Sequence, residues 1–390
     1  MGGFPLRKIG RAIGDFFKGA DMVLLLLCIV TTIFGIVIIS SATESEGSAR
    51  YVMVQSVALV LGILIYVVLT LVDVDIIAER REILLIFSLL FIGCLKFWGI
   101  SGETGNRSWL DIPLLPMNVQ PGEVCKIFFI IILAKSMSVS QNRLSSPITI
   151  GKLGLLTAVF FLEIVYVSSD AGVALLYVLI FVIMAFVGGV NIIWFLMAGG
   201  ALVIGAPILL ALMREDQYNR IMMIFDPSID PTGQGVRWQT NLSLQAITNG
   251  GLAGQGLYNG TMVRSSSIPA QHTDFIFSAI AEELGILGCV AVLLLLTAIV
   301  VRCLHVGVKS GNFMNRIICV GIAGMLLFQI IINVGMCLGV LPVIGLTLPF
   351  VSYGGTSVFT MFMAMGIVSG IHMRPAPDAN ARYIRPRSAA

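Results

Sequence analysis

An acidic residue stands where a long polar stretch gives way to an apolar run. Asp274 lies at the point where about sixty residues of mixed composition end and a hydrophobic helix is expected to begin. Thr273 is placed to cap that helix, so Asp274 falls in its first turn, where free N–H groups favour an ionised carboxylate. Ser278 and Glu282 follow at spacings of four, which predicts a polar stripe on one helix face. The simplest alternative is that Asp274 only stabilises the start of the helix.

Other charged residues lie within or beside apolar runs, where a charge is expensive and usually functional. Glu123 and Lys126 are three residues apart near the start of one run, directly after Gln120 and Pro121. They form either part of a polar site or a private ion pair. Asp170 precedes another apolar run and is either a site residue or the start of a helix.

Two further segments carry polar and aromatic residues. Arg107 and Trp109 lie in a compact polar segment, and Ser352 and Tyr353 lie in a segment rich in Gly and Pro between apolar stretches. Irregular backbone at membrane depth must be buried in protein or line a wet cavity. The second segment is therefore predicted to be a turn that lines a ligand site.

Composition indicates a membrane protein. Of 390 residues, 57% are hydrophobic and 12% are charged, against about 25% charge in soluble domains. Runs long enough to span a bilayer predict an all-α integral membrane protein with about ten transmembrane helices. These runs are 21–41, 52–72, 83–100, 121–138, 153–169, 171–189, 192–213, 274–301, 317–341 and 358–372.

Loop charges predict the orientation. With a cytoplasmic N-terminus, fifteen Lys and Arg residues fall in inner segments and six in outer segments. This asymmetry places both termini in the cytoplasm and Asp274 at the outer face. The predicted parts are a cytoplasmic amphipathic segment (1–18), a polytopic membrane domain (19–373) with one long extracytoplasmic loop (214–273), and a flexible cytoplasmic tail (374–390).

Several functions are excluded by what the sequence lacks. It has no Walker A signature, zinc motif or Gly-x-Ser-x-Gly elbow, which argues against ATP hydrolysis, zinc proteolysis and a lipase triad. The net charge of +3 is too small to suggest a nucleic acid partner. Seven cysteines, mostly in apolar runs and without a CxxC pair, predict no disulfide and no metal site built on thiolates.

Taken in order, the polar motifs resemble those of the SEDS family, the shape, elongation, division and sporulation proteins RodA, FtsW and SpoVE. The resemblance covers nearly the whole chain, from the first apolar run to about Met373. Gly122 stands where the family usually has Ser. The matching motifs are Gln120-Pro121-x-Glu123-x-x-Lys126, Asp170-x-Gly172, Phe225-Asp226-Pro227, Gly250-Gly251-x-x-Gly254-x-Gly256, His272-Thr273-Asp274, Glu282-Glu283-Leu284-Gly285 and Leu348-Pro349-Phe350-x-Ser352-Tyr353-Gly354-Gly355.

The resemblance implies a peptidoglycan glycosyltransferase in the bacterial cytoplasmic membrane. Such proteins polymerise lipid II outside that membrane and work with a class B penicillin-binding transpeptidase and other elongation or division proteins. Asp274 then takes the family's essential acidic position. The expected substrate-binding residues are Arg107, Trp109, Glu123, Lys126, Asp170, His272, Thr273, Ser352 and Tyr353.

The expected reaction is one inverting displacement of undecaprenyl pyrophosphate, with Asp274 as base and Arg107 and Lys126 as cations for the leaving group. A carboxylate at a helix N-terminus is a weak base, so substrate would have to desolvate Asp274. Asp274 could instead orient the hydroxyl or bind a divalent cation, and no other cofactor is expected. The alternative function is a flippase for the lipid-linked precursor. The choice between elongation, division and sporulation stays open.

Overall fold

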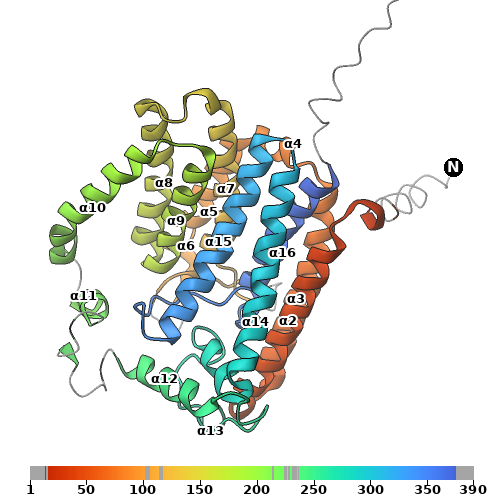
Figure 1. Cartoon of the computed structure of the whole chain (residues 1–390), viewed down its shortest axis with the longest axis vertical. Helices are drawn as coiled ribbons and strands as arrows, with labels where there is room; N and C mark the ends of the chain where they lie inside the picture. The colour runs from red at the N-terminus through yellow and green to blue at the C-terminus, as the bar shows by residue number, and fades with distance from the viewer. Residues whose placement is uncertain are drawn as a thin grey trace, which may run out of the picture.

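The computed structural model describes residues 14, 16–101, 106–113, 117–212, 215–223, 226, 229–230, 235 and 237–374. Long helices dominate, as Figure 1 shows. The helices that match predicted runs are α2 (Met22–Ala42), α3 (Ser48–Leu71), α5 (Arg81–Gly93) with α6 (Leu95–Trp98), α7 (Pro121–Val139), α8 (Pro147–Ser168), α9 (Ala171–Gly188), α10 (Ile192–Leu212), α14 (Ile276–Lys309), α15 (Phe313–Cys337) and α16 (Gly355–Met373).

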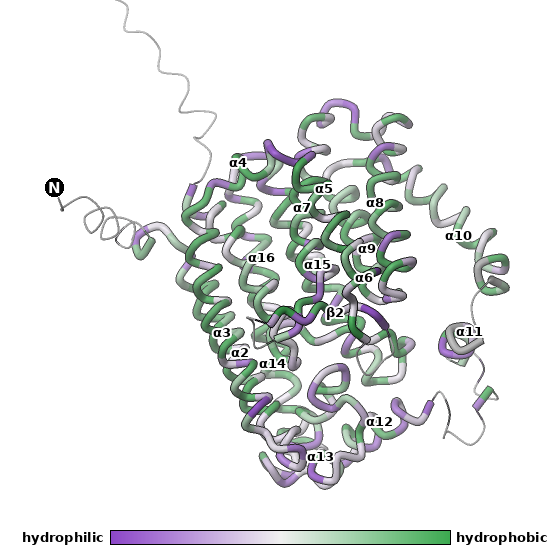
Figure 2. Tube along the Cα trace, turned by 180° about the vertical axis from the view of Figure 1, so that it is seen from behind, coloured by the Kyte–Doolittle hydropathy of each residue, from purple (hydrophilic) through white to green (hydrophobic). Residues whose placement is uncertain are grey.

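The all-α membrane fold predicted from the sequence is confirmed. Seven described helices are long and apolar enough to cross a bilayer: α2, α3, α8, α9, α14, α15 and α16. Figure 2 shows hydrophobic residues along these helices and hydrophilic residues gathered in the connections at the two ends of the bundle. The helices α5, α7 and α10 occupy the other predicted runs, so the count of ten spans stays a prediction.

The last two helices, α15 and α16, are the most buried of these seven helices. In the most apolar stretch of α16, 83% of residues are buried, against 22% in α8, so α16 is an interior helix and α8 a peripheral one. Close packing of α16 on α3 depends on glycines at the crossing points. A Cβ at Gly62 would lie 2.8 Å from Phe362, and one at Gly366 would lie 2.9 Å from the Tyr66 backbone.

The start of α2 lies beside the ends of α14 and α16. The Asp21 carboxylate, which caps α2, accepts a 2.7 Å ion pair from Arg302 near the end of α14, and Asp21 N donates to Ser369 near the end of α16. Beyond α16, Arg374 donates to the carbonyl of Thr70 at 3.0 Å. We call this the inner end, because the charge count predicts that it faces the cytoplasm, and we call the opposite end, which holds Ala42 and Asp274, the outer end.

Both terminal segments lie mostly outside the described residues. Within the predicted amphipathic segment, the Phe16 ring packs edge-on against Tyr66, with ring centroids 6.5 Å apart, while Phe17 is exposed. Of the predicted tail, the structure describes Arg374 alone.

Short elements complete the outer and inner connections. At the outer end, Gly99–Ile100 (β1) pairs antiparallel with Trp109–Leu110 (β2). The long predicted loop contains α11 (Glu215–Met222), α12 (Trp238–Gly250) and α13 (Thr261–Arg264). The remaining short helices are α4 (Val74–Glu79), η1 (Glu44–Glu46) and η2 (Gln141–Arg143).

A glycine breaks α14 near its start. Gly285 has φ 67° and ψ −166°, a conformation that only glycine adopts readily. The glycine-rich segment after α12 pairs with the broken turn: Ile286 N donates to Gly251 O at 3.0 Å, and Gln255 N donates to Glu282 O at 2.9 Å. These bonds satisfy main-chain groups that the break would otherwise expose. A Cβ on Gly285 would lie 2.4 Å from Gly254 N, so the two segments need glycine on both sides.

Candidate active site

The main chain around Asp274 is held by three hydrogen bonds from distant parts of the sequence. Tyr353 N donates to His272 O at 2.8 Å, Ser352 Oγ donates to Thr273 O at 2.6 Å, and Asn333 Nδ2 donates to Asp274 O at 2.9 Å. Consecutive carbonyls are thus fixed by α15 and by the connection to α16. This arrangement places the Asp274 carboxyl group at a defined point of the outer end.

These bonds correct the predicted helix start. The helix α14 begins at Ile276, its N-cap is Phe275, and neither Thr273 nor Asp274 lies in its first turn. The reason is that Ser278 N donates to Phe275 O at 3.0 Å, while the carbonyls of Thr273 and Asp274 accept from side chains outside the helix. Asp274 therefore lies in a turn before the helix, and the weak-base argument based on a first-turn position no longer applies.

The side chains of the predicted polar stripe on α14 contact the long loop. Ser278 forms a 2.5 Å hydrogen bond with Ser243 of α12. Glu282 is fully buried, and its carboxylate accepts from Met262 N and Val263 N, both at 2.9 Å, and from Thr261 Oγ1 at 3.1 Å. These side chains anchor the long loop on α14.

Three aromatic rings form a wall beside Asp274. The rings of Tyr51 and His272 have centroids 4.9 Å apart, His272 and Tyr353 are 5.6 Å apart, and Tyr51 and Tyr353 are 5.1 Å apart, all edge to face. Burial raises the pKa of the Tyr353 phenol, which therefore stays neutral and can act as a hydrogen-bond donor at neutral pH. A wall of this kind suits the apolar face of a sugar ring.

Gln55, which the sequence analysis did not single out, holds the turn that carries Ser352. Gln55 of α3 is fully buried, donates to Ser352 O at 3.0 Å and accepts from Gly354 N at 3.1 Å. Ser352 Oγ also accepts from Leu348 N at 2.8 Å. Ser352 is thus a positioning residue for Thr273, since its hydroxyl already has a donor and an acceptor.

Asp170 holds a second polar group together. Its carboxylate caps α9 by accepting from Val173 N at 3.0 Å, and it accepts from Ser108 Oγ at 3.3 Å and from Gln120 Nε2 at 3.2 Å. The helix-start interpretation of Asp170 therefore has direct geometric support. Through Ser108 it also fixes the segment that carries Arg107 and Trp109, where Arg107 is exposed and Trp109 is half-buried in β2.

Glu123 and Lys126 form a buried ion pair in the first turns of α7. Lys126 Nζ lies 2.7 Å from Glu123 Oε1, and their exposed fractions are 0% and 4%. A buried pair is costly to separate, because each charge would lose its partner in a medium of low dielectric constant. Both the private pair and the site interpretation fit this geometry.

The outer connection between α15 and α16 lies against both the residues around Asp274 and the residues around Asp170. A Cβ on Gly172, just after Asp170, would lie 2.4 Å from Ile344 O, and one on Gly345 would lie 3.6 Å from Asp274 Oδ2. Thr356 Oγ1 donates to Asn118 O at 2.5 Å, which ties the start of α16 to the segment before α7. The segment of Arg107 and Trp109 joins this cluster through Ser108, which donates to Asp170, and through the main-chain pair of Leu110 and Val119.

Sequence reasoning missed Asn333, Gln55 and Tyr51. A signal for the first two was present, since each is an amide in an apolar run where a polar side chain must find a partner. Their partners are main-chain groups far along the sequence, so the sequence could not identify them.

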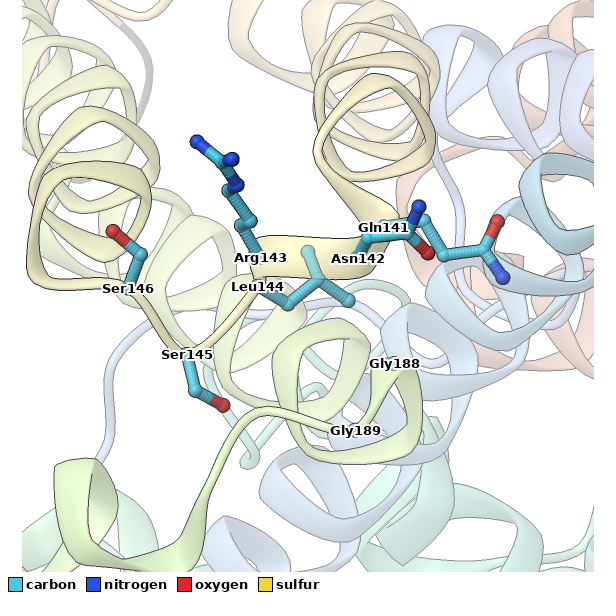
Figure 3. A pocket seen from close by; sticks show the side chains of 8 residues that line it. All are labelled: Gln141, Asn142, Arg143, Leu144, Ser145, Ser146, Gly188 and Gly189. Atoms are coloured by element: carbon cyan, nitrogen blue, oxygen red, sulfur yellow. The ribbon is translucent and has the colours of Figure 1, made fainter.

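The part of the chain that the structure describes holds no metal cluster, and a hollow in it lies at the inner end. Among the described residues, no group of three or more His, Cys, Asp or Glu side chains is placed to hold a metal ion. Figure 3 shows a hollow where α7 passes through η2 into α8, beside the end of α9. It lies at the inner end, away from Asp274, and its lining is Gln141, Asn142, Arg143, Leu144, Ser145, Ser146, Gly188 and Gly189.

Comparison with known proteins agrees with this architecture. The family model of the cell cycle proteins FtsW, RodA and SpoVE matches residues 20–376. The chain belongs to this family. The SEDS family predicted from the motifs is therefore confirmed.

Relatives of this family member match over nearly their full length. It is 29% identical to the peptidoglycan glycosyltransferase MrdB of Escherichia coli K12, over 90% of this chain and 93% of MrdB. It is 30% identical to the probable peptidoglycan glycosyltransferase FtsW of Trichlorobacter lovleyi, over 93% and 96%. A chain of a solved peptidoglycan synthase complex, described as coordinating polymerization and crosslinking, superposes with a TM-score of 0.74 at 29% identity, over 94% and 99%.

The position of Asn333 leads to a first prediction. Asn333→Leu removes the donor to Asp274 O and to Leu346 O, which lies 2.7 Å from Asn333 Nδ2, and the loss of these two bonds should cost about 2 kcal/mol of stability. Polymerising activity should fall at least tenfold through kcat, because Asp274 is no longer held in place. Thermal unfolding in detergent and steady-state kinetics measure the two effects. An unchanged kcat would contradict the positioning role.

Proposed function

We propose that this protein is a peptidoglycan glycosyltransferase that joins lipid II units at the outer face of the bacterial cytoplasmic membrane. The observation that carries the proposal is the fixation of three successive carbonyls, those of His272, Thr273 and Asp274, by α15 and by the connection between α15 and α16. Three hydrogen bonds that fix the main chain of one acidic turn are best explained by a catalytic function of the Asp274 carboxyl group. The family and the names of the relatives support the same activity.

In the proposed reaction, the acceptor hydroxyl attacks an anomeric carbon and displaces lipid pyrophosphate. Asp274 accepts the hydroxyl proton, the new glycosidic bond forms with inversion, and the bond to pyrophosphate breaks. The leaving group carries negative charge, which Lys126 and Arg107 stabilise. The wall of Tyr51, His272 and Tyr353 provides stacking surface for a sugar.

The weak-base argument from a first-turn position does not apply to Asp274. Because α14 begins at Ile276, the carboxylate is not in the first turn, where free N–H groups would hold its proton affinity low. Orienting the hydroxyl and binding a divalent cation at the pyrophosphate stay as alternative roles for the same carboxylate.

The proposed partner is a class B penicillin-binding transpeptidase. The superposition on a chain of a peptidoglycan synthase complex supports this partner. The part of the long loop from α12 to α13 offers outer surface for such a contact, since Glu282 and the glycines around Gly285 anchor it to α14. Relatives named for different processes match about equally, so the cellular role can be elongation, division or sporulation.

Product analysis tests the proposed function. Purified protein with its transpeptidase is incubated with labelled lipid II in detergent, and the strands are separated by size and their linkages assigned by NMR. We expect long β-linked strands, since a single displacement inverts the α-linked donor. Failure to form strands from active lipid II, or strands with α-linkages, would contradict the proposed reaction.

A further inference from the structure

Three buried side chains, one each on α7, α15 and α16, carry polar atoms that the reaction described above does not use. Glu123 Oε2, both side-chain polar atoms of Gln329 and the Thr360 hydroxyl have no hydrogen-bond partner within the described part of the chain. The exposed fractions are 4% for Glu123 and 0% for Gln329 and Thr360. Buried polar atoms in native proteins nearly always have partners, so the unpaired atoms of these side chains need an explanation.

Helix geometry places Glu123 of α7 and Gln329 of α15 at a similar depth in the bundle. The side chain of Ile130 lies 2.9 Å from a Cβ built on Gly321, which fixes the register of α7 against α15. Glu123 is two turns outward of Ile130 and Gln329 is just over two turns outward of Gly321, so both lie ~10–12 Å from that contact. Glu123 and Ile130 share a helix face, which places Glu123 on the side of α7 that faces α15.

Thr360 of α16 lies at a similar depth to Glu123 and Gln329. It lies one turn inward of Thr356, whose hydroxyl bonds to Asn118 O just before α7 begins. Residues four apart share a helix face, so Thr360 also faces α7. On α15, Gln329 lies one turn inward of Asn333, which holds Asp274. By this helix geometry, Gln329 and Thr360 lie one turn inward of Asn333 and Thr356, at about the depth of the buried ion pair.

We propose that Gln329 and Thr360 are alternative hydrogen-bond donors for Glu123, which take over its carboxylate when substrate pyrophosphate draws Lys126 away. Without them, moving Lys126 would leave a buried carboxylate with no partner, which is prohibitive. With them, Glu123 exchanges an ammonium donor for an amide and a hydroxyl, and Lys126 becomes free to bind an anion. This exchange rests on the proposed function, because it assumes that Lys126 binds the leaving group.

The unpaired donors should lower the stability of the substrate-free protein, and this effect can be measured. Gln329→Leu keeps the side-chain volume and removes a buried unpaired amide, so it should raise the thermal unfolding temperature in detergent. The same change should weaken binding of undecaprenyl pyrophosphate roughly tenfold, the effect of one lost hydrogen bond to a charged group. Thr360→Val should act in the same direction through the second donor.

Controls separate this role from a structural one. Asn315→Leu, near the inner end of α15, also removes a buried amide with an unpaired oxygen, and it should leave binding unchanged. In a Glu123→Gln background, Gln329→Leu should cause no further loss of binding, because there is no carboxylate to receive the donors. Wild-type affinity in both Gln329→Leu and Thr360→Val would overturn the exchange.

The binding measurement does not depend on catalysis. Wild-type protein that binds undecaprenyl pyrophosphate but makes no glycan would overturn the proposed function and leave the exchange supported by the variants. Polymerisation with unchanged kinetic constants and unchanged binding in the Gln329 and Thr360 variants would overturn the exchange alone.

Discussion

Asp274→Asn is expected to lower glycan synthesis roughly a thousandfold, the usual contribution of a positioned general base. The amide has the shape of the carboxylate but cannot accept the proton of the acceptor hydroxyl. The fold should survive, because the bonds that fix this segment are made by the main-chain carbonyls of His272, Thr273 and Asp274. Strand synthesis from lipid II and thermal unfolding in detergent measure the two properties.

A second carboxylate at the outer end provides the control. Asp111→Asn removes one exposed negative charge from the segment after β2, and its activity should stay within twofold of the wild type because exposed charges are largely screened. Full activity of Asp274→Asn would eliminate the base role. Activity restored to that variant by added divalent cation would favour the orienting or cation-binding alternatives.

Glu282→Leu is expected to destabilise the protein by about 3–5 kcal/mol, the effect of leaving several buried donors without their charged partner. The donors are Met262 N, Val263 N and Thr261 Oγ1, which hold α13 and its loop on α14. Glu282→Gln should lose less, since one side-chain oxygen can still accept. Chemical or thermal unfolding in detergent gives the order of stability, wild type above Gln above Leu.

An exposed glutamate close by is the matched control for this change. Glu44 belongs to η1 and is exposed, so Glu44→Gln should change stability by less than about 0.5 kcal/mol. If Glu282→Leu proved as stable as the wild type, the long loop would have to be anchored by other contacts.

The sequence was a good guide to the apolar helices and a poor one to the polar contacts between them. Hydrophobic runs located the helices because length and hydropathy are local properties, closely at 171–189 for α9 and 121–138 for α7, but the run 274–301 ended eight residues before α14 does. The start of α14 was missed because Thr273 and Asp274 have the composition of a helix start. Their carbonyls bond to Ser352 and Asn333, and no local pattern reports such a bond.

The predicted site residues fall into two classes. His272, Thr273, Ser352 and Tyr353 are brought together around Asp274, as their motifs suggested. Asp170 lies apart from them, its carboxylate accepts three hydrogen bonds from its own chain, and substrate binding by it stays a prediction. A sequence identifies residues that are costly to bury, but only the structure shows whether the protein itself supplies their partners.

One measurement tests the account most directly. Wild-type protein and Asp274→Asn, each with the transpeptidase, are placed in liposomes that contain labelled lipid II, and strand length and movement of lipid II between leaflets are read from the same vesicles. We predict strands from the wild type alone, with lipid movement at the level of empty liposomes in both samples. Lipid movement without strands in the wild type would contradict the glycosyltransferase and point to a flippase.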